Sequence, residues 1–235
     1  MIEMLSTKAI QNLSQMTDTT SIHYIIQNLR AVYGVPKLTP GRDPLDVLIE
    51  TILSQSTTNA NSKRAFESLK QRFPDWELAR RARVSSIEAA IKSGGLAKQK
   101  SVRIKEVLNE IHKRRGSLDL AFLKTAPLEE ASAFLGSFKG VGPKTVACTL
   151  LFAFNRPLFP IDTHIFRIAR RVGLIPERRA DDEAHQLMRE MIPSKSYFEV
   201  HINLIRLGRQ ICRPRDPLCE RCCLVDYCEY YAERY

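Results

Sequence analysis

The sequence predicts an all-α protein. Apolar side chains recur at the spacing of an amphipathic helix through most of the 235 residues, and no convincing run of alternating β-branched residues interrupts them. Glycines stand where several of these patterns stop, as they do at the C-terminal ends of helices. Because apolar residues make up 44% of the chain, it has enough of them to form a packed core.

The expected helices follow from these apolar stripes in chain order. Thr20 or Ser21 is expected to cap the first, and Asp43 before Pro44 has the pattern of an N-cap followed by the first helical residue. The stripes cover residues 22–32, 45–53, 65–73, 87–91, 102–111, 128–135, 145–154, 165–172, 184–192 and 197–211. The glycines at their ends are Gly34, Gly94, Gly95, Gly116 and Gly173.

The sequence shows neither a membrane span nor a signal peptide, and this predicts a cytoplasmic protein. No apolar window of about 18 residues predicts a membrane span, and residues 1–20 lack the apolar run of a signal peptide. We interpret residues 1–20 as a loose tail. The short proline-containing breaks at 35–42 and 155–160 imply that any two domains pack side by side.

The formal charge of +10 favours a polyanionic partner, although solubility alone could account for it. Basic residues crowd two segments, which a merely solvated surface explains poorly. The first comprises Lys98, Lys100, Arg103, Lys105, Lys113, Arg114 and Arg115, and the second comprises Arg206, Arg209, Arg213, Arg215 and Arg221. Arg213 and Arg215 belong to a stiff, proline-containing loop that could present them to phosphate.

A very short turn within residues 134–145 joins two predicted helices. Gly140 and Gly142 offer a bare glycine surface, and Pro143 suits the first position of the second helix. The free N–H groups of that helix, which carries Thr145 in its first turn, would then bind a DNA phosphate. The alternative is an ordinary helix–helix turn, because a lone Gly-x-Gly is weak evidence.

Lys144 follows this turn directly. A cation in the first turn of a helix is at the unfavourable end of the helix dipole, and that field favours the neutral amine that a lysine nucleophile needs. The alternative is a solvated lysine that only contacts phosphate.

Asp162 precedes another predicted helix, where an aspartate is the expected N-cap. A capped carboxylate is also rigid and ionised, so it can stabilise the positive charge that develops on deoxyribose when a base is cleaved off. It could also take the proton of an attacking lysine. His164 is a candidate helper, with a satisfied histidine near a helix start as the alternative.

Cysteines cluster between residues 212 and 228, and in a chain without a signal peptide this density favours metal binding over disulfides. The predicted ligands are Cys212, Cys219, Cys222 and Cys228. Their spacing matches neither the paired cysteines of zinc sites nor ferredoxin-type runs, so it leaves the metal open. Cys223 could replace Cys222, whereas Cys148 lies on an apolar stripe and is expected to be buried.

Together these residues resemble the endonuclease III family of helix-hairpin-helix DNA glycosylases, over about residues 43–230. The motifs that carry the resemblance are Gly140-Val141-Gly142-Pro143-Lys144-Thr145, Ile161-Asp162-Thr163-His164 and the cysteine spacing. The resemblance implies two helical domains with a cleft between them. One is a six-helix barrel-like domain over residues 43–154, and the other joins 21–42 to 155–235 and ends in the cysteine loop. It also implies that the four cysteines hold a 4Fe–4S cluster.

The resemblance implies a role for individual residues. Lys144 matches the Schiff-base lysine and Asp162 the essential aspartate, and the two are expected to face each other across the cleft. Gln55 is similar to the glutamine that fills the gap left by the flipped base. Leu96 is similar to the wedge that enters the opposite strand, with a core contact at a helix end as the alternative. The segment around Gln55 and the Phe138-Lys139-Gly140 turn are also similar to plant DNA demethylases, which remove 5-methylcytosine.

The sequence therefore predicts a monomeric, nucleoid-associated DNA glycosylase and abasic-site lyase of base excision repair. It would bind double-stranded DNA with a damaged base or abasic site, and remove oxidised pyrimidines through a lysine Schiff base and β-elimination. One rival is a monofunctional mismatch or modified-base glycosylase, for example for 5-methylcytosine. The mismatch enzymes usually lack a lysine where this chain has Lys144. Other rivals are a non-catalytic iron–sulfur DNA-binding protein and a zinc-stapled scaffold.

Overall fold

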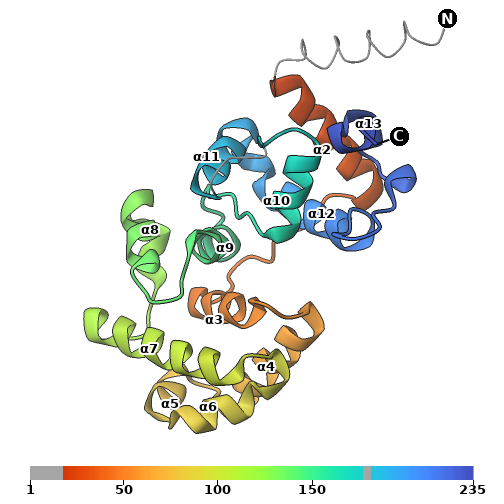
Figure 1. The fold of residues 1–235 in the computed structure, drawn as a ribbon. Coiled ribbons are helices and arrows are strands. Elements are labelled where there is room, and N and C mark those ends of the chain that lie inside the picture. The colour runs from red at the N-terminus through yellow and green to blue at the C-terminus, as the bar shows by residue number, and fades with distance from the viewer. Residues whose placement is uncertain (1–17, 177–180, 235) are drawn as a thin grey trace, which may run out of the picture. The chain divides into compact units, whose positions relative to one another are not determined.

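The computed structural model describes residues 18–176 and 181–234, in which α-helices are joined by loops and short 3-10 turns (Figure 1). No strand occurs among these residues, so the predicted all-α class is confirmed. The chain divides into two compact units. The hairpin unit is Leu38–Pro160, and the cysteine unit combines the described parts of Met1–Lys37 and Ile161–Tyr235. The expected tail lies outside the described residues except for 18–20, which are helical.

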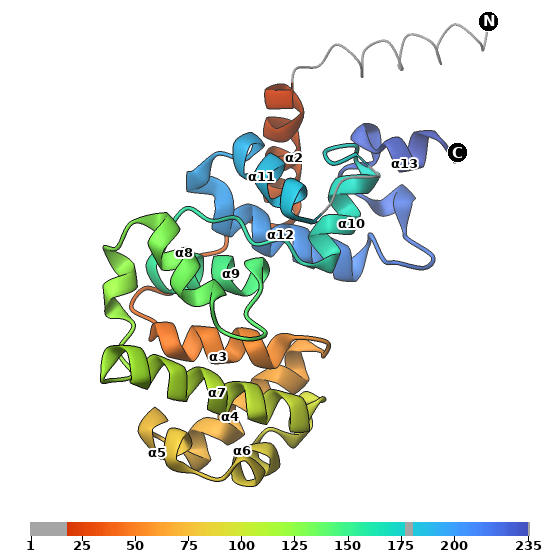
Figure 2. The ribbon, with the colours of Figure 1, turned by 60° about the vertical axis from the view of Figure 1, so that its left-hand side comes forward.

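The hairpin unit is built around one apolar helix, α3 (Pro44–Ser54). Asp43 caps it, because its Oδ1 accepts a hydrogen bond from the N–H of Leu45 at 2.8 Å, and Pro44 is the first helical residue, as predicted. α3 packs most extensively on α9 (Pro143–Phe154), which lies next to it in Figure 2. Its wholly buried side chains are Leu48, Ile49, Ile52 and Leu53. A helix that is apolar on most sides is stable only as the centre of a core.

The other elements of this unit cover α3 and extend the core. They are α4 (Asn59–Arg72), α5 (Trp76–Arg81), α6 (Val84–Ala90), η1 (Lys92–Gly94), α7 (Ala97–Arg115), η2 (Ala121–Lys124) and α8 (Leu128–Gly136). Figure 2 shows α7 between α3 on one side and α5 and α6 on the other. α5 is not among the predicted helices, because only Trp76 and Ala79 of its 6 residues are buried and two apolar positions do not define a stripe.

The cysteine unit is arranged around α12 (Tyr197–Gln210), which packs on α10 (Thr163–Arg171) and α2 (Asp18–Tyr33). Its other elements are α11 (Asp181–Met191), η3 (Ser194–Ser196), η4 (Cys219–Arg221), η5 (Val225–Tyr227) and α13 (Glu229–Ala232). Asn203 of α12 is fully buried and its Nδ2 donates to Gly34 O at 2.9 Å. The side chain of Asn203 in α12 therefore satisfies a carbonyl group directly after the end of α2.

Some sequence predictions about this unit are wrong. Thr20 and Ser21 lie within α2, so neither of them is its N-cap. α13 is missing from the predicted helices because its 4 residues are too few to show a period. None of the described helices is long and apolar enough to cross a membrane.

Candidate functional site

The predicted hairpin connects α8 to α9 through residues 137–142. The turn closes with a hydrogen bond from the N–H of Val141 to Phe138 O at 3.0 Å. Gly140 has a φ of +78°, which residues with a side chain rarely adopt. Gly142 is the N-cap of α9, and no atom lies within 4 Å of the point where its Cβ would be. The N-terminus of α9 is therefore open beside Gly142, as a phosphate site made of backbone requires.

Gly140 is not bare, contrary to the sequence prediction. A Cβ at this position would lie 2.0 Å from Nε and 2.4 Å from Cζ of Arg103, so the guanidinium group crosses the glycine directly. Arg103 comes from α7, and its Nη1 donates to Oε1 of Gln55 at 2.5 Å. This glycine is needed for the close approach of an arginine of the same chain, and Gly142 is the open glycine of the turn.

Gln55 stands at the C-terminal end of α3 and contacts the hairpin. Its Nε2 donates to Gly140 O at 3.4 Å and to Oγ1 of Thr145 at 3.3 Å. Thr145 is only 2% exposed, and its N–H donates to Gly142 O at 2.9 Å. The fold thus brings together two predicted site residues that are 90 positions apart in the chain.

Lys144 is the second residue of α9 and is half-buried. Pro143 is the first helical residue, as the sequence predicts, so the backbone of Lys144 is fixed in the first turn next to Gly142. Lys144 therefore lies at the helix end where the dipole is positive.

Leu96 lies in the turn that leads into α7. It has a φ of +50° and a ψ of +33°, a left-handed conformation, and it is 52% exposed. Such a conformation costs a non-glycine residue about 1–3 kcal/mol, so the surrounding structure must hold it. The alternative of a core contact does not apply, because more than half of this residue is exposed.

Much of the first basic segment is bound to the protein itself. Lys100 is 2% exposed, and its Nζ donates to Leu53 O at 2.7 Å and to Gly94 O at 2.9 Å. Burial lowers the pKa of Lys100, and the charge of Arg103 lowers it further. Lys105 likewise donates to carbonyl groups at the C-terminal end of α5. For Lys100, which is buried, the interpretation as part of a polyanion-binding surface is wrong. Arg103 and Lys105 are half-buried and bind groups of the same chain.

In the cysteine unit, Asp162 caps α10 as predicted. Its Oδ1 accepts from the N–H groups of His164 at 2.9 Å and Ile165 at 2.8 Å. His164 packs closely on Gly208 of α12. A Cβ added to Gly208 would lie only 2.8 Å from the Cβ of His164. Its Nδ1 is 3.1 Å from Nη2 of Arg167. These contacts match the alternative prediction of a satisfied histidine near a helix start.

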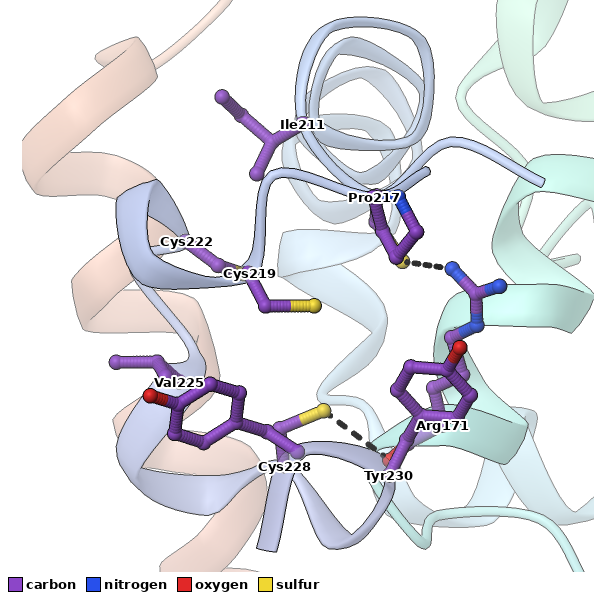
Figure 3. A pocket seen from close by; sticks show the side chains of 10 residues that line it. Arg171, Ile211, Pro217, Cys219, Cys222, Val225, Cys228 and Tyr230 are labelled. Carbon is purple, nitrogen blue, oxygen red and sulfur yellow. Dashed lines mark hydrogen bonds between the residues drawn. The ribbon is translucent and has the colours of Figure 1, made fainter. Parts of the chain in front are cut away.

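The predicted cysteine ligands line one pocket in the cysteine unit (Figure 3). They are Cys212, Cys219, Cys222 and Cys228. Figure 3 shows the side chains of Cys219 and Cys228 pointing into the pocket, with Arg171 across from them. Cys223 is not among the lining residues, and Cys148 is buried in α9, as predicted. Within residues 18–176 and 181–234, no three His, Cys, Asp or Glu side chains gather closely enough to bind a single metal ion.

Arg171, in the last turn of α10, ties the cysteine loop to that helix. Its Nη1 lies 3.3 Å from Sγ of Cys212 and donates to Arg213 O at 2.8 Å. Sγ of Cys228 donates back to Arg171 O at 3.3 Å (dashed in Figure 3). The loop that carries the exposed Arg213 and Arg215 is thereby anchored. Arg171 is not among the predicted site residues, because its only signal in the sequence is a basic residue near a helix C-terminus.

The pocket disfavours free thiolates. The pKa of the Cys222 thiol is raised to about 12, mainly by burial and in smaller part by the charges of the neighbouring cysteines. Burial likewise raises the pKa of Cys228. Thiolates here would be stabilised by nearby positive charge, which a bound metal centre would supply in addition to Arg171.

Comparisons with known proteins agree with this arrangement. Residues 49–194 match the HhH-GPD superfamily of base excision DNA repair proteins. The chain is 43% identical over 165 residues to a candidate DNA glycosylase of Arabidopsis thaliana, covering 70% of this chain and 56% of that one. It therefore spans little more than half the length of that relative. To endonuclease III of Thermotoga maritima it is 31% identical over 192 residues, covering 82% of this chain and 85% of that one.

A solved non-covalent complex of endonuclease III with DNA has the same fold. The TM-score is 0.80 at 22% identity, and the match covers 94% of this chain and 99% of that one. This likeness extends over nearly all of the chain, well beyond the hairpin motif. With the superfamily match and the similarity to the Thermotoga enzyme, it follows that the chain belongs to the endonuclease III-like family of helix-hairpin-helix DNA glycosylases.

Proposed function

We propose that this protein is a monomeric DNA glycosylase with abasic-site lyase activity, which removes oxidised pyrimidines from duplex DNA in base excision repair. The observation that carries the proposal is Lys144 in the first turn of α9, directly after the open Gly142, in a chain of this family. A helix N-terminus that binds a DNA phosphate would hold the neighbouring sugar within reach of that amine.

The first half of the reaction releases the base. The damaged nucleotide leaves the stack, which costs least where the base already pairs or stacks poorly. The neutral amine of Lys144 attacks C1′ of the deoxyribose, and the C1′–N bond breaks with its electron pair going to the base. Asp162 stabilises the positive charge on the sugar and accepts a proton from the attacking amine.

The second half cuts the strand. The sugar ring opens to an imine between Nζ of Lys144 and C1′. Loss of a C2′ proton then drives β-elimination, in which the C3′–O bond breaks and the phosphate leaves with its electron pair. Water hydrolyses the imine and regenerates the lysine amine.

Other predicted residues would support this reaction by contacting the DNA duplex. Gln55 would fill the space that the extruded nucleotide leaves, and Leu96 would enter the opposite strand. Leu96 suits such a part because a large apolar side chain is held outward in a strained conformation. Arg213 and Arg215, both exposed, would contact phosphates and position the duplex.

A panel of duplex oligonucleotides tests the proposal. Each carries one thymine glycol, uracil, abasic site, 8-oxoguanine or 5-methylcytosine, and base release and strand nicking are measured separately. We expect release and nicking together on thymine glycol. Release without nicking would support the monofunctional rival, and preferred release of 5-methylcytosine would support a demethylase-like enzyme. Tight binding with no turnover on any duplex would contradict the proposed activity.

We infer further that Cys212, Cys219, Cys222 and Cys228 hold a 4Fe–4S cluster. Cysteine thiolates are the usual ligands of such clusters, and all four thiols line one pocket. When bound, the cluster would supply the positive charge that keeps the buried cysteines deprotonated and would close the loop that carries Arg213 and Arg215.

Replacing Cys222 by serine is expected to remove the bound iron and its brown colour and to lower the midpoint of urea unfolding. The reason is that one ligand of a site that stabilises the loop is lost. Cys223→Ser is the matched control, since this neighbouring cysteine does not line the pocket, and it should keep both iron and colour. Iron analysis and the visible spectrum are the measurements. A colourless wild-type protein that contains zinc would contradict the cluster.

A further inference from the structure

Lys100 is a buried charged residue that the proposed chemistry does not use. It is 2% exposed and lies beside the apolar core of the hairpin unit, where lysine is rarely found. Its Nζ donates to two main-chain carbonyl groups, Leu53 O at 2.7 Å and Gly94 O at 2.9 Å. Burying an ammonium group is unfavourable, so these two bonds must offset a considerable cost.

The two carbonyl groups belong to the C-terminal ends of two different helices. Leu53 is in the last turn of α3, directly before the segment that carries Gln55. Gly94 ends η1, two positions before Leu96 in the sequence. Carbonyl groups at such ends have no partner within their own helix and carry the negative end of the dipole. One ammonium group therefore caps both helix ends and ties them together.

Each capped end leads into a strained residue. Ser56, next to Gln55, has a φ of +52°, and Leu96 has a φ of +50°. Such residues persist only where their surroundings hold them. The main-chain N–H of Lys100 adds a further tie, since it donates to Leu96 O at 3.0 Å. Lys100 is thus bound to the Leu96 turn through both its backbone and its side chain.

The same helix also holds the side chain of Gln55. Arg103, three positions after Lys100 in α7, donates to Oε1 of Gln55 at 2.5 Å. α7 therefore fixes the backbone of both loops through Lys100 and orients the half-buried side chain of Gln55 through Arg103.

We propose that Lys100 is a positioning residue for DNA engagement, which holds the loops of Gln55 and Leu96 at a fixed separation so that both side chains enter the duplex together. The inference rests on the proposed function, because it takes Gln55 and Leu96 as the residues that enter DNA. Lys100 itself touches neither the substrate nor the reacting atoms, and it acts through the two loops.

The test measures the insertion of the two side chains into DNA separately from the release of the base. A duplex carries a stable abasic analogue opposite 2-aminopurine, whose fluorescence rises when a side chain unstacks it. Wild-type protein at saturation is expected to give a clear rise, and Lys100→Met, which keeps the length of the side chain but lacks its donors, to give little or none. Single-turnover base release should fall about 100-fold, as expected for a contact misplaced by about 1 Å.

Lys105→Met is the matched control. Lys105 lies on the same helix and caps α5 in the same manner, but its carbonyl partners lead into neither loop. The control is expected to lower the thermal unfolding temperature while it leaves the fluorescence rise and the rate within about twofold of wild type. Equal loss in both variants would overturn the proposal, because it would show that any damage to α7 has the same effect.

A coupling measurement separates positioning from stability. In a protein that already carries Gln55→Ala and Leu96→Ala, Lys100→Met is expected to change the rate by less than about twofold, because its targets are gone. An undiminished further loss would contradict the proposal. Where circular dichroism shows that Lys100→Met is unfolded, Lys100→Gln, which keeps a shorter donor, takes its place.

The outcomes distinguish this proposal from the proposed function. A fluorescence rise with wild-type protein but no base release from any lesion would refute the glycosylase activity and leave the role of Lys100 intact. A wild-type rise in Lys100→Met, or no rise with wild-type protein, would refute the role of Lys100.

Discussion

Replacing Lys144 by alanine is expected to abolish the covalent complex that borohydride traps on abasic DNA, and to slow strand nicking by at least about 10³-fold. Alanine has no amine to form the imine that borohydride reduces, and no other step of the proposed reaction supplies one. Alanine is also a strong helix former, so the first turn of α9 should be preserved. Denaturing gels of the trapped complex and single-turnover nicking are the measurements.

Lys144→Arg distinguishes a nucleophile from a phosphate contact. Arginine keeps the positive charge and the reach of the side chain, but its guanidinium group stays protonated and does not attack carbon. If Lys144 only contacts phosphate, the arginine variant should retain most of the activity. We expect it to bind undamaged duplex about as well as wild type and to be as inactive as the alanine variant. A trapped complex in either variant would show that another residue is the nucleophile.

The hairpin is predictable from sequence because its determinants are local. Gly142, Pro143 and the positive φ of Gly140 act through the local backbone, so a short segment of sequence specifies the turn and the start of α9. The same holds for Asp43 and Asp162, which cap helices that begin at the next residue.

The environment of Gln55 is not predictable in this way. Its partners lie far away in the sequence, Arg103 at a separation of 48 residues and Gly140 at 85. Neither composition nor periodicity reports contacts over such distances. For this reason the sequence suggests Gln55 only through family resemblance, and the arginine that covers Gly140 is unexpected.

Lys100 is a different case, because the sequence does contain its signal. The buried positions of α7 include Ile104, Val107 and Ile111, and Lys100 continues this stripe one turn earlier. Its basic neighbours in the sequence suggest that Lys100 is part of a charged surface. Its position on the same helical face as the buried apolar residues predicts instead that it is buried. Helical phase therefore predicts the environment of a lysine better than its charged neighbours do.

The cysteine loop is predictable in composition but not in shape. Spacing selects Cys212, Cys219, Cys222 and Cys228, and these line the pocket. The path of the chain between them depends on Arg171, which comes from a helix 41 residues earlier than Cys212. A loop without a periodic pattern of its own takes its shape from such distant contacts and from whatever the pocket binds.

Asparagine in place of Asp162 is expected to leave stability nearly unchanged and to slow base release by about 10²–10³-fold. Asparagine caps helices about as well as aspartate, so its Oδ1 can still accept the two bonds from the backbone at the start of α10. What the variant loses is the negative charge that would stabilise the sugar cation. Thermal unfolding and single-turnover base release, measured on the same protein, separate the two roles.

Asp43→Asn is the matched control, since Asp43 caps α3 with the same geometry and has no part in the proposed chemistry. Both asparagine variants should unfold close to wild type, and only Asp162→Asn should lose activity. In Asp162→Ala the cap is lost as well, at a cost of about 1 kcal/mol in stability, with little further loss of rate. If Asp162→Asn releases base as fast as wild type while Asp162→Ala is slow, then Asp162 acts only as a helix cap and the charge on the sugar is stabilised by another group.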